Sequence, residues 1–361
     1  MTSHRIRQLK LILKSKKTEA LLVSDSFNVS FLTGLYPLTP LEREAFLLLT
    51  DRNSYFLTFS TYIGLFDNKN SDYQIRYVTP FKGLTFILNE ILKKEKVKTL
   101  TLEKNGLSLA EFLRFQKNLK VELVPEDGIV EKIRLIKSES EIRNISLAAG
   151  LTDAAFKYTL SQIKKGVTEK ELAFKIEFFI KKNNADLAFS PIIAFSQNSA
   201  IPHYFPSLNI KLSPPGVVLM DFGAKVNNYC ADMTRVVFFG SPSVRLINLY
   251  NTVLLAQQKA FNFTRCGKMG HEIDKIARDY IEKNGFESFR HGLGHGVGLA
   301  IHEDPRLSPK SKQVLEENMV FTVEPGIYIP GFAGVRLEDL VVLKQNGPEL
   351  LSKSTKEIII L

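Results

Sequence analysis

The sequence predicts two domains, an α/β layered domain over residues 1–128 and an α+β domain over residues 129–361. Three observations lead to this prediction. A chain of 361 residues exceeds the usual size of a single domain. Strand-like and helix-like segments alternate through the first third, as in a layered α/β domain. After a polar break near Pro125–Asp127, two pairs of helices alternate with two strand-rich blocks.

The first domain reads as a small α/β sheet domain without chemistry of its own. Its hairpin turns at Asp51–Asn53, between two apolar runs. The domain contains one histidine, His4, and neither a glycine-rich phosphate loop nor a cluster of metal-ligand type. The expected segments are a helix over 5–16, a strand over 18–24, the hairpin over 43–60, and strands alternating with helices over 75–79, 81–94, 97–103, 107–119 and 121–127.

The second domain begins with a helix pair marked by two capping boxes. Ser138 with Glu141, and Thr168 with Glu171, have the spacing in which each side chain caps the other's backbone. Gly285 marks the end of the last helix. The expected helices cover residues 138–163, 168–182, 243–264 and 272–284, and the strand-rich blocks cover 216–239 and 319–343.

Composition narrows the class of protein. The net charge of +10 is spread evenly, without a basic tail, so nucleic acid is not an expected partner. No apolar run is long enough to cross a bilayer, and the basic N-terminal segment lacks the features of a secretory signal. Cys230 and Cys266 are the only cysteines, which favours a cytoplasmic location.

Two aspartates stand in the first strand-rich block, GVVLMDFGAKVNNYCADMTRVVFFG. A hairpin folded between Val226 and Asn227 would place Asp221 opposite Asp232. Cβ atoms of directly opposed residues lie about 4.5–5.5 Å apart, so the two carboxylates would repel each other. A cation between them would remove this repulsion.

Two glutamates repeat the arrangement in the second block. Glu324 and Glu338 are equidistant from Gly331, and each stands in an apolar strand. A buried, unpaired carboxylate costs several kcal/mol or loses its charge. A bound divalent cation is the simplest way to avoid that cost.

Three of the six histidines fall within residues 291–302, interleaved with glycines, in HGLGHGVGLAIH. Histidine is the commonest metal ligand, and glycine lets the backbone approach closely. Four carboxylates and one imidazole suit two divalent cations such as Mn²⁺, Co²⁺ or Zn²⁺. They do not suit a structural zinc site, which favours cysteine.

Together these motifs resemble the pita-bread metallopeptidases, which include methionine aminopeptidases, Xaa-Pro aminopeptidases and Xaa-Pro dipeptidases. The resemblance covers residues 131–361 and implies a pita-bread catalytic domain behind a creatinase/prolidase-type N-terminal domain. Because all five ligand positions are filled, creatinase and the non-catalytic homologues fit less well. The motifs are Asp221, Asp232, GHGVG around His295, TVEPG around Glu324 and RLED around Glu338.

The resemblance implies a role for each of the five ligands. Asp221 would bind one metal ion, and Asp232 and Glu338 would bridge both ions. His295 and Glu324 would complete the sphere of the second ion. Mn²⁺ is the first expectation for the metal, with Co²⁺ or Zn²⁺ as alternatives.

The resemblance also implies which side chains act on substrate. Glu324 would accept a proton from the attacking water. His302 in IHEDP and His203 in AIPHY would face the scissile carbonyl and amide. His291 would be an additional active-site histidine of the proline-specific branch, unless it only makes a structural hydrogen bond. Arg336 matches an arginine of the same branch.

Four further residues receive weaker assignments. Thr234 lies two residues after Asp232 and could orient that carboxylate. Tyr328 is a weaker candidate for the substrate pocket. We expect Cys230 to be a small core residue and His271 to be structural.

The separate N-terminal domain, with His291 and Arg336, favours the proline branch. The expected activity is that of a Xaa-Pro aminopeptidase, which would act on small peptides with proline at the second position. A Xaa-Pro dipeptidase is the alternative, and a non-catalytic peptide-binding homologue is the third possibility. The resemblance further implies a homodimer.

Overall fold

The computed structural model describes residues 2–16, 18–36, 43–65 and 72–361. The chain divides into two compact units between Arg134 and Leu135. This division lies a few residues after the boundary at 128 that the sequence suggests. The side chain of Asn28 explains the difference, because it donates to Glu131 and accepts from Arg134. These two contacts attach the segment after residue 128 to the first unit.

The described strands of the first unit form one mixed sheet in the order β4-β3-β2-β1-β5-β6. Its hairpin β2–β3 turns at the predicted residues, and the predicted alternation of strands and helices is confirmed. Helix α2 was not predicted, because its eight residues are nearly all buried and show no amphipathic pattern. The bounds are α1 (Thr2–Ser15), β1 (Ala20–Val23), α2 (Ser26–Thr33), β2 (Ala45–Thr50), β3 (Ser54–Phe59), η2 (Ser60–Tyr62), β4 (Gln74–Val78), α3 (Leu84–Lys94), β5 (Thr99–Glu103), α4 (Leu109–Asn118), β6 (Glu122–Glu126) and α5 (Glu131–Leu135).

The second unit contains the predicted order of helix pair, strands, helix pair, strands. Both capping boxes are present, at Ser138 with Glu141 and at Thr168 with Glu171. The helices are α6 (Glu139–Leu160), α7 (Glu169–Lys182), α8 (Val244–Phe263) and α9 (Gly270–Lys283). The strands and the short helix are β7 (Asp186–Leu187), β8 (Ile192–Phe195), η3 (Ser196–Ala200), β9 (Gly216–Phe222), β10 (Ala224–Val226), β11 (Tyr229–Cys230), β12 (Met233–Phe239), β13 (Gly294–Gly296), β14 (Glu303–Leu307), β15 (Val320–Val323), β16 (Gly326–Ile329), β17 (Ala333–Arg336), β18 (Asp339–Lys344) and β19 (Gly347–Leu350).

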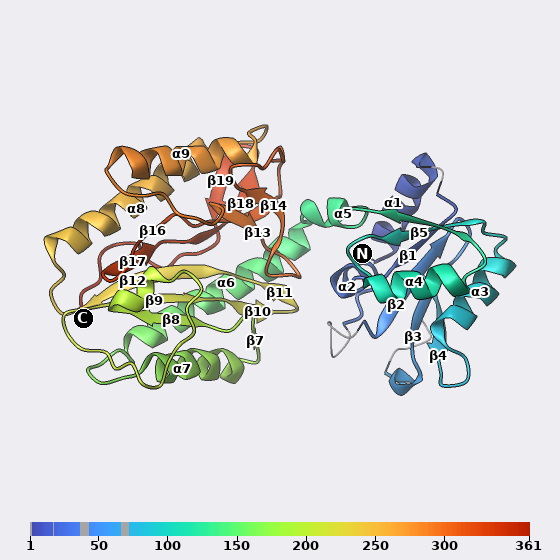
Figure 1. The fold of residues 1–361 in the computed structure, drawn as a ribbon, viewed down its shortest axis with the longest axis horizontal. Helices are drawn as coiled ribbons and strands as arrows, with labels where there is room; N and C mark the ends of the chain where they lie inside the picture. The colour runs from blue at the N-terminus through green and yellow to red at the C-terminus, as the bar shows by residue number, and fades with distance from the viewer. Residues whose placement is uncertain (1, 17, 37–42, 66–71) are drawn as a thin grey trace. The chain divides into compact units, whose positions relative to one another are not determined.

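Strand β9 separates the two hydrophobic cores of this unit. Val217 and Leu219 pack with residues of α8 and α9, whereas Val218 and Met220 pack with residues of α6 and α7. Figure 1 shows β9 and β12 between α7 on one side and the α8–α9 pair on the other. By strand alternation, Asp221 lies on the α8–α9 side. That side carries the functional cluster.

The register predicted for the hairpin that carries Asp221 and Asp232 is wrong by two residues. Asp221 pairs with Thr234 rather than with Asp232, because the chain turns at Asn227–Asn228. Both asparagines have positive φ, +48° and +67°, as the favoured two-residue hairpin turn requires. Asp232 therefore lies just before β12, on the same face as Thr234, and still approaches Asp221.

The register predicted for the strands that carry Glu324 and Glu338 is confirmed. Val323 pairs with Asp339 and Gly326 pairs with Arg336, which is the register that places Glu324 opposite Glu338. The two glutamates lie in the short interval between the two ladders, Glu324 directly after β15 and Glu338 directly before β18. Within the described residues, no helix is both long and apolar enough to span a membrane.

Candidate active site

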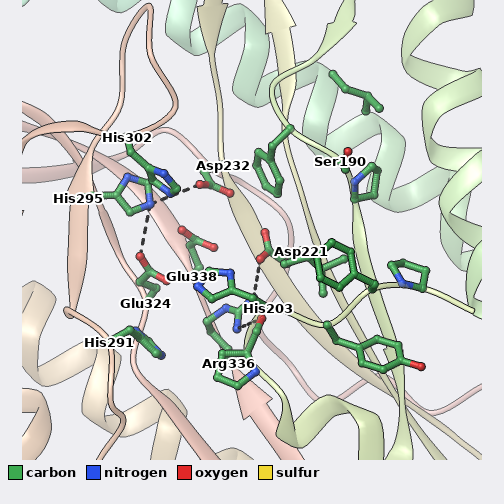
Figure 2. Close-up of a pocket in the computed structure, with 18 of the residues that line it drawn as sticks. Ser190, His203, Asp221, Asp232, His291, His295, His302, Glu324, Arg336 and Glu338 are labelled. Carbon is green, nitrogen blue, oxygen red and sulfur yellow. Dashed lines mark hydrogen bonds and ion pairs between the residues drawn. The ribbon is translucent and has the colours of Figure 1, made fainter. Parts of the chain in front are cut away.

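One cavity in the second unit, with a volume of about 790 Å³, brings together all the residues predicted as metal ligands or catalytic residues, whereas the weaker candidate Tyr328 is not among its lining residues. Figure 2 shows the imidazole and carboxylate groups converging on its interior from strands and loops far apart in the sequence. The predicted residues that line it are His203, Asp221, Asp232, His291, His295, His302, Glu324, Arg336 and Glu338. Proximity agrees with their predicted roles but does not by itself assign them.

A cluster of metal-ligating groups lies at the centre of the cavity. One possible ligand atom from each of Asp232, His295 and Glu338 lies within 4.8 Å of the others. His295 Nε2 is 3.5 Å from Asp232 Oδ2 and 3.4 Å from Glu324 Oε1. Oxygen and imidazole donors without sulfur suit divalent cations such as Mn²⁺, Co²⁺ or Zn²⁺.

Unsatisfied oxygens show that the cluster fits such cations. Asp221 Oδ1, Asp232 Oδ1 and Glu338 Oε1 are buried and have no hydrogen-bond partner among the residues that the structure describes. Burying a polar atom without a partner is costly, and a bound cation removes the cost. The five predicted ligands would therefore hold the metal ions.

The electrostatics of the carboxylates point the same way. Burial raises the pKa of Asp232 and Glu338 well above the usual range, and the negative charges of neighbouring carboxylates raise them further. Burial also raises the pKa of Glu324 to about 8, although the nearby Arg336 opposes the rise. The cluster thus favours bound protons, which divalent cations would displace on binding.

Two glycines explain the close packing of β13, which carries His295. A Cβ atom on Gly294 would lie 1.9 Å from the carbonyl oxygen of Thr322, and one on Gly296 would lie 2.1 Å from that of Asp304. Only glycine lets β13 fit between β14 and β15. Burial lowers the pKa of His295 to about 3, so its imidazole is neutral and able to bind a metal ion.

Arg336 holds two of the carboxylates in place. Its Nη2 pairs with Asp221 Oδ2 at 2.5 Å, and its Nε donates to Thr234 Oγ1 at 3.1 Å. Thr234 in turn donates to Glu338 Oε2 at 2.6 Å. Thr234 therefore orients Glu338, and not Asp232 as the sequence suggested. The guanidinium of Arg336 is engaged with groups of the protein.

His291 is also held by groups of the protein. Its Nδ1 donates to the Gly292 carbonyl at 2.8 Å, which leaves Nε2 to accept from the Tyr328 hydroxyl at 2.9 Å. The same hydroxyl accepts from Arg336 at 3.0 Å. Burial, helped by the positive charge of Arg336, lowers the pKa of His291 to about 4. These contacts favour the structural alternative for this histidine.

His302 and His203 differ from His291. Among the described residues, neither imidazole has a hydrogen-bond partner, and both residues are exposed at the cavity. The ring of His302 lies edge-on to that of His295, with centroids 4.3 Å apart. Both imidazoles are therefore available to a bound substrate next to the carboxylate cluster.

A buried carboxylate anchors the loop that carries His203. Glu169, at the start of α7, is fully buried, and its oxygens accept from the backbone of Phe195 and Ser207 and from the Asn198 side chain. These contacts lie on both sides of His203. Glu169 was not predicted, because nothing near residue 169 in the sequence indicates the partners that folding brings to it.

Other residues of the cavity were also missed. Arg306, on β14, lines the cavity, and its Cα is the cross-strand partner of that of His295. Its guanidinium makes no hydrogen bond or ion pair with any described residue. Lys170, Phe174 and Glu177 line the cavity from one face of α7. Their spacing along one face of a helix can be recognised in the sequence. The element that this face would meet cannot be recognised there.

Two minor predictions agree with the structure. Cys230 is 2% exposed and belongs to the core. His271 contacts the Ser311 carbonyl through Nδ1, at 2.9 Å, and does not line the cavity.

Comparison with known proteins identifies both parts of the chain. Residues 5–136 match the creatinase/prolidase N-terminal domain, and residues 143–345 match metallopeptidase family M24. A Xaa-Pro dipeptidase of Pyrococcus horikoshii is 33% identical over 99% of each chain.

Solved structures agree with this assignment. A Xaa-Pro dipeptidase from Bacillus anthracis superimposes with a TM-score of 0.94 at 34% identity, covering 100% of both chains. An X-Pro aminopeptidase from Thermotoga maritima gives a TM-score of 0.86 at 33% identity, covering 95% of this chain and 97% of that one. With its N-terminal creatinase/prolidase domain and its pita-bread catalytic domain, the chain belongs to metallopeptidase family M24.

Proposed function

We propose that the chain is a Xaa-Pro dipeptidase that uses two divalent metal ions. The relatives support this choice, because several that match nearly the whole chain bear the name Xaa-Pro dipeptidase. The sequence favoured a Xaa-Pro aminopeptidase, and the X-Pro aminopeptidase from Thermotoga maritima supports that reading. That reading now has weaker support than its alternative.

The observation that carries the proposal is the unengaged guanidinium of Arg306 in the cavity. A dipeptide ending in proline presents a carboxylate close to its scissile bond, whereas a longer peptide has an uncharged amide there. Lys170 and Arg336 also line the cavity, but Arg336 already pairs with Asp221, and the Lys170 ammonium lies over the Phe174 ring on α7. Arg306, in contrast, is the cross-strand partner of the predicted ligand His295. Arg306 is therefore the cation best placed to bind a free proline carboxylate.

The five ligands would be Asp221, Asp232, His295, Glu324 and Glu338, with Mn²⁺ proposed first and Co²⁺ or Zn²⁺ as alternatives. Divalent ions held there supply Lewis acidity and lower the pKa of water toward neutrality.

The remaining steps fall to side chains of the chain itself. Glu324 would take a proton from the attacking water and deliver it to the leaving nitrogen. His302 and His203 would donate hydrogen bonds to the carbonyl oxygen as it gains negative charge. The proline nitrogen carries no hydrogen in the substrate, so the cavity must select proline by its shape.

We also propose that the protein acts in the cytoplasm as a homodimer, without nucleic acid or membrane as partner. Its two cysteines support the first point, because both are unpaired in the structure. The homodimer rests on the resemblance alone.

The choice of substrate is tested with Ala-Pro, Ala-Pro-Ala-Ala and Met-Ala-Ser, each with Mn²⁺ present. We expect rapid hydrolysis of Ala-Pro, little of the tetrapeptide and none of Met-Ala-Ser. Efficient cleavage of Ala-Pro-Ala-Ala at its first bond would restore the aminopeptidase reading. Cleavage of Met-Ala-Ser would show that the enzyme is not specific for proline. If none of the three peptides were hydrolysed, a non-catalytic peptide-binding protein would be favoured.

The role of Arg306 is tested by comparing Ala-Pro with Ala-Pro-amide, which lacks the carboxylate. A hydrogen bond to a charged group contributes about 1.5–3 kcal/mol, so Arg306→Gln should lower kcat/KM for Ala-Pro roughly 10-fold or more. The variant should treat the dipeptide and its amide nearly alike, whereas the wild type strongly prefers the free acid. An unchanged preference in Arg306→Gln would show that another group binds the carboxylate.

A further inference from the structure

The strands that carry Glu324 and Glu338 are interrupted where the two glutamates lie. The ladder is regular up to Val323 paired with Asp339 and resumes at Gly326 paired with Arg336. In the interval, the N–H of Glu324 donates to the Leu293 carbonyl at 2.7 Å, away from the partner strand.

Two other residues of this interval also form no regular backbone hydrogen bond between the two strands. The N–H of Glu338 donates to the Thr234 carbonyl at 3.1 Å, and Pro325 has no N–H. The backbone bond that remains across the interval, from Leu337 to Pro325, is long at 3.4 Å. The backbone that fixes both carboxylates therefore lacks the usual support of its own ladder.

One side chain from α8 bridges this interval. Gln257 Nε2 donates to the Val323 carbonyl at 3.0 Å and to the Leu337 carbonyl at 3.1 Å. These carbonyls belong to the residues that directly precede Glu324 and Glu338. Because both partners are acceptors, the amide must present its nitrogen to them. Gln257 is 2% exposed, so water does not compete readily for these bonds.

We propose that Gln257 is a positioning residue of the metal centre. Its amide holds the two strands at the separation at which Glu324 and Glu338 lie beside His295 in the carboxylate and imidazole cluster. This inference rests on the divalent metal centre of the proposed function, but not on which peptide is cleaved. Gln257 does not line the catalytic cavity, so it is not placed to touch a substrate bound there.

The amide is the part of Gln257 that matters. Its Oε1 has no partner among the described residues, so an isosteric change that removes only the nitrogen donors tests the two bonds directly. Gln257→Glu makes this change and places one oxygen against both carbonyls. Gln257→Met keeps the length of the side chain without a donor or a charge.

The neighbouring residue provides matched controls. Gln258 lies one position further along α8 and is exposed. Gln258→Glu and Gln258→Met therefore reproduce the same changes in charge and helix propensity without touching either carbonyl.

The test measures the dissociation constant of Mn²⁺ by calorimetry on each purified, metal-stripped, full-length protein. We expect the Gln257 variants to bind Mn²⁺ about 10–100-fold more weakly, as for other residues that orient ligands, and to regain most of their kcat at saturating Mn²⁺. The Gln258 variants should bind like the wild type. Wild-type affinity in folded Gln257→Glu and Gln257→Met would overturn the proposal, and so would equal weakening in the Gln258 variants.

Thermal unfolding of the metal-free proteins separates positioning from general stability. If both Gln257 variants prove unstable, Gln257→Asn decides, because it keeps the amide but withdraws it by one methylene. Weaker Mn²⁺ binding by a folded Gln257→Asn protein supports the proposal, and unchanged binding overturns it. A wild type that binds Mn²⁺ but does not cleave Ala-Pro would refute the proposed substrate and leave the role of Gln257 standing.

Discussion

Asp232→Asn and Glu338→Gln are expected to lose the bound metal ions and, with them, peptide hydrolysis. Both carboxylates are buried, and each has an oxygen without a hydrogen-bond partner among the described residues. Metal ions contribute several kcal/mol to stabilisation of the transition state, so activity should fall by at least roughly 1,000-fold. Elemental analysis of the purified variants, together with kcat/KM for Ala-Pro, measures both effects.

The stability of the metal-free proteins distinguishes a ligand from a structural residue. Each substitution removes one of several buried, mutually repelling carboxylates, so the metal-free variants should unfold at temperatures no lower than the metal-free wild type. Asp279→Asn, on the surface of α9, is the matched control and should retain both metal and activity. A normal metal content in Asp232→Asn would contradict its assignment as a bridging ligand.

His302→Ala is expected to keep the metal ions but to lose most of the catalytic rate. The imidazole has no hydrogen-bond partner among the described residues and lies beside His295 at the cavity. Loss of one donor to the developing oxyanion typically costs about 100–1,000-fold in kcat. Steady-state kinetics and metal analysis of the same preparation measure the two properties together.

His271→Ala is the matched control for this change, because His271 does not line the cavity. It should leave kcat unaltered. If His302→Ala lost metal as completely as Asp232→Asn, His302 would be a ligand and the assignment of the five ligands would be wrong.

Much of the fold could be predicted because its signals are local. The capping boxes at Thr168 with Glu171 and at Ser138 with Glu141 depend on residues three apart, and both are present. The hairpin at Asp51–Asn53 likewise depends on a short turn between apolar runs. Such features depend on residues close together in the sequence, so sequence patterns can predict them.

The one error in register arose where a turn had two possible centres. Placing the turn at Val226–Asn227 rather than at Asn227–Asn228 moved the partner of Asp221 from Thr234 to Asp232. The preference of asparagine for positive φ was the signal that could have decided it. At Glu324 and Glu338 the turn centre was correct, and so was the register.

The side chains that support the site were harder to predict. Gln257 and Glu169 each reach partners on a distant element, and no spacing within their own segments indicates those partners. Arg336 was predicted to be a site residue, but only the structure shows its ion pair with Asp221. Sequence patterns found the residues with distinctive chemistry, whereas the contacts that hold them required the tertiary structure.

The central claim is that the carboxylate and imidazole cluster is a dinuclear metal centre that cleaves the Xaa-Pro bond. The most direct test strips the protein with a chelator and then titrates Mn²⁺ into it while Ala-Pro hydrolysis and bound metal are measured together. We predict no hydrolysis by the stripped protein, and activity that reaches its plateau at two Mn²⁺ ions per chain. Full activity in a rigorously metal-free preparation would contradict the account.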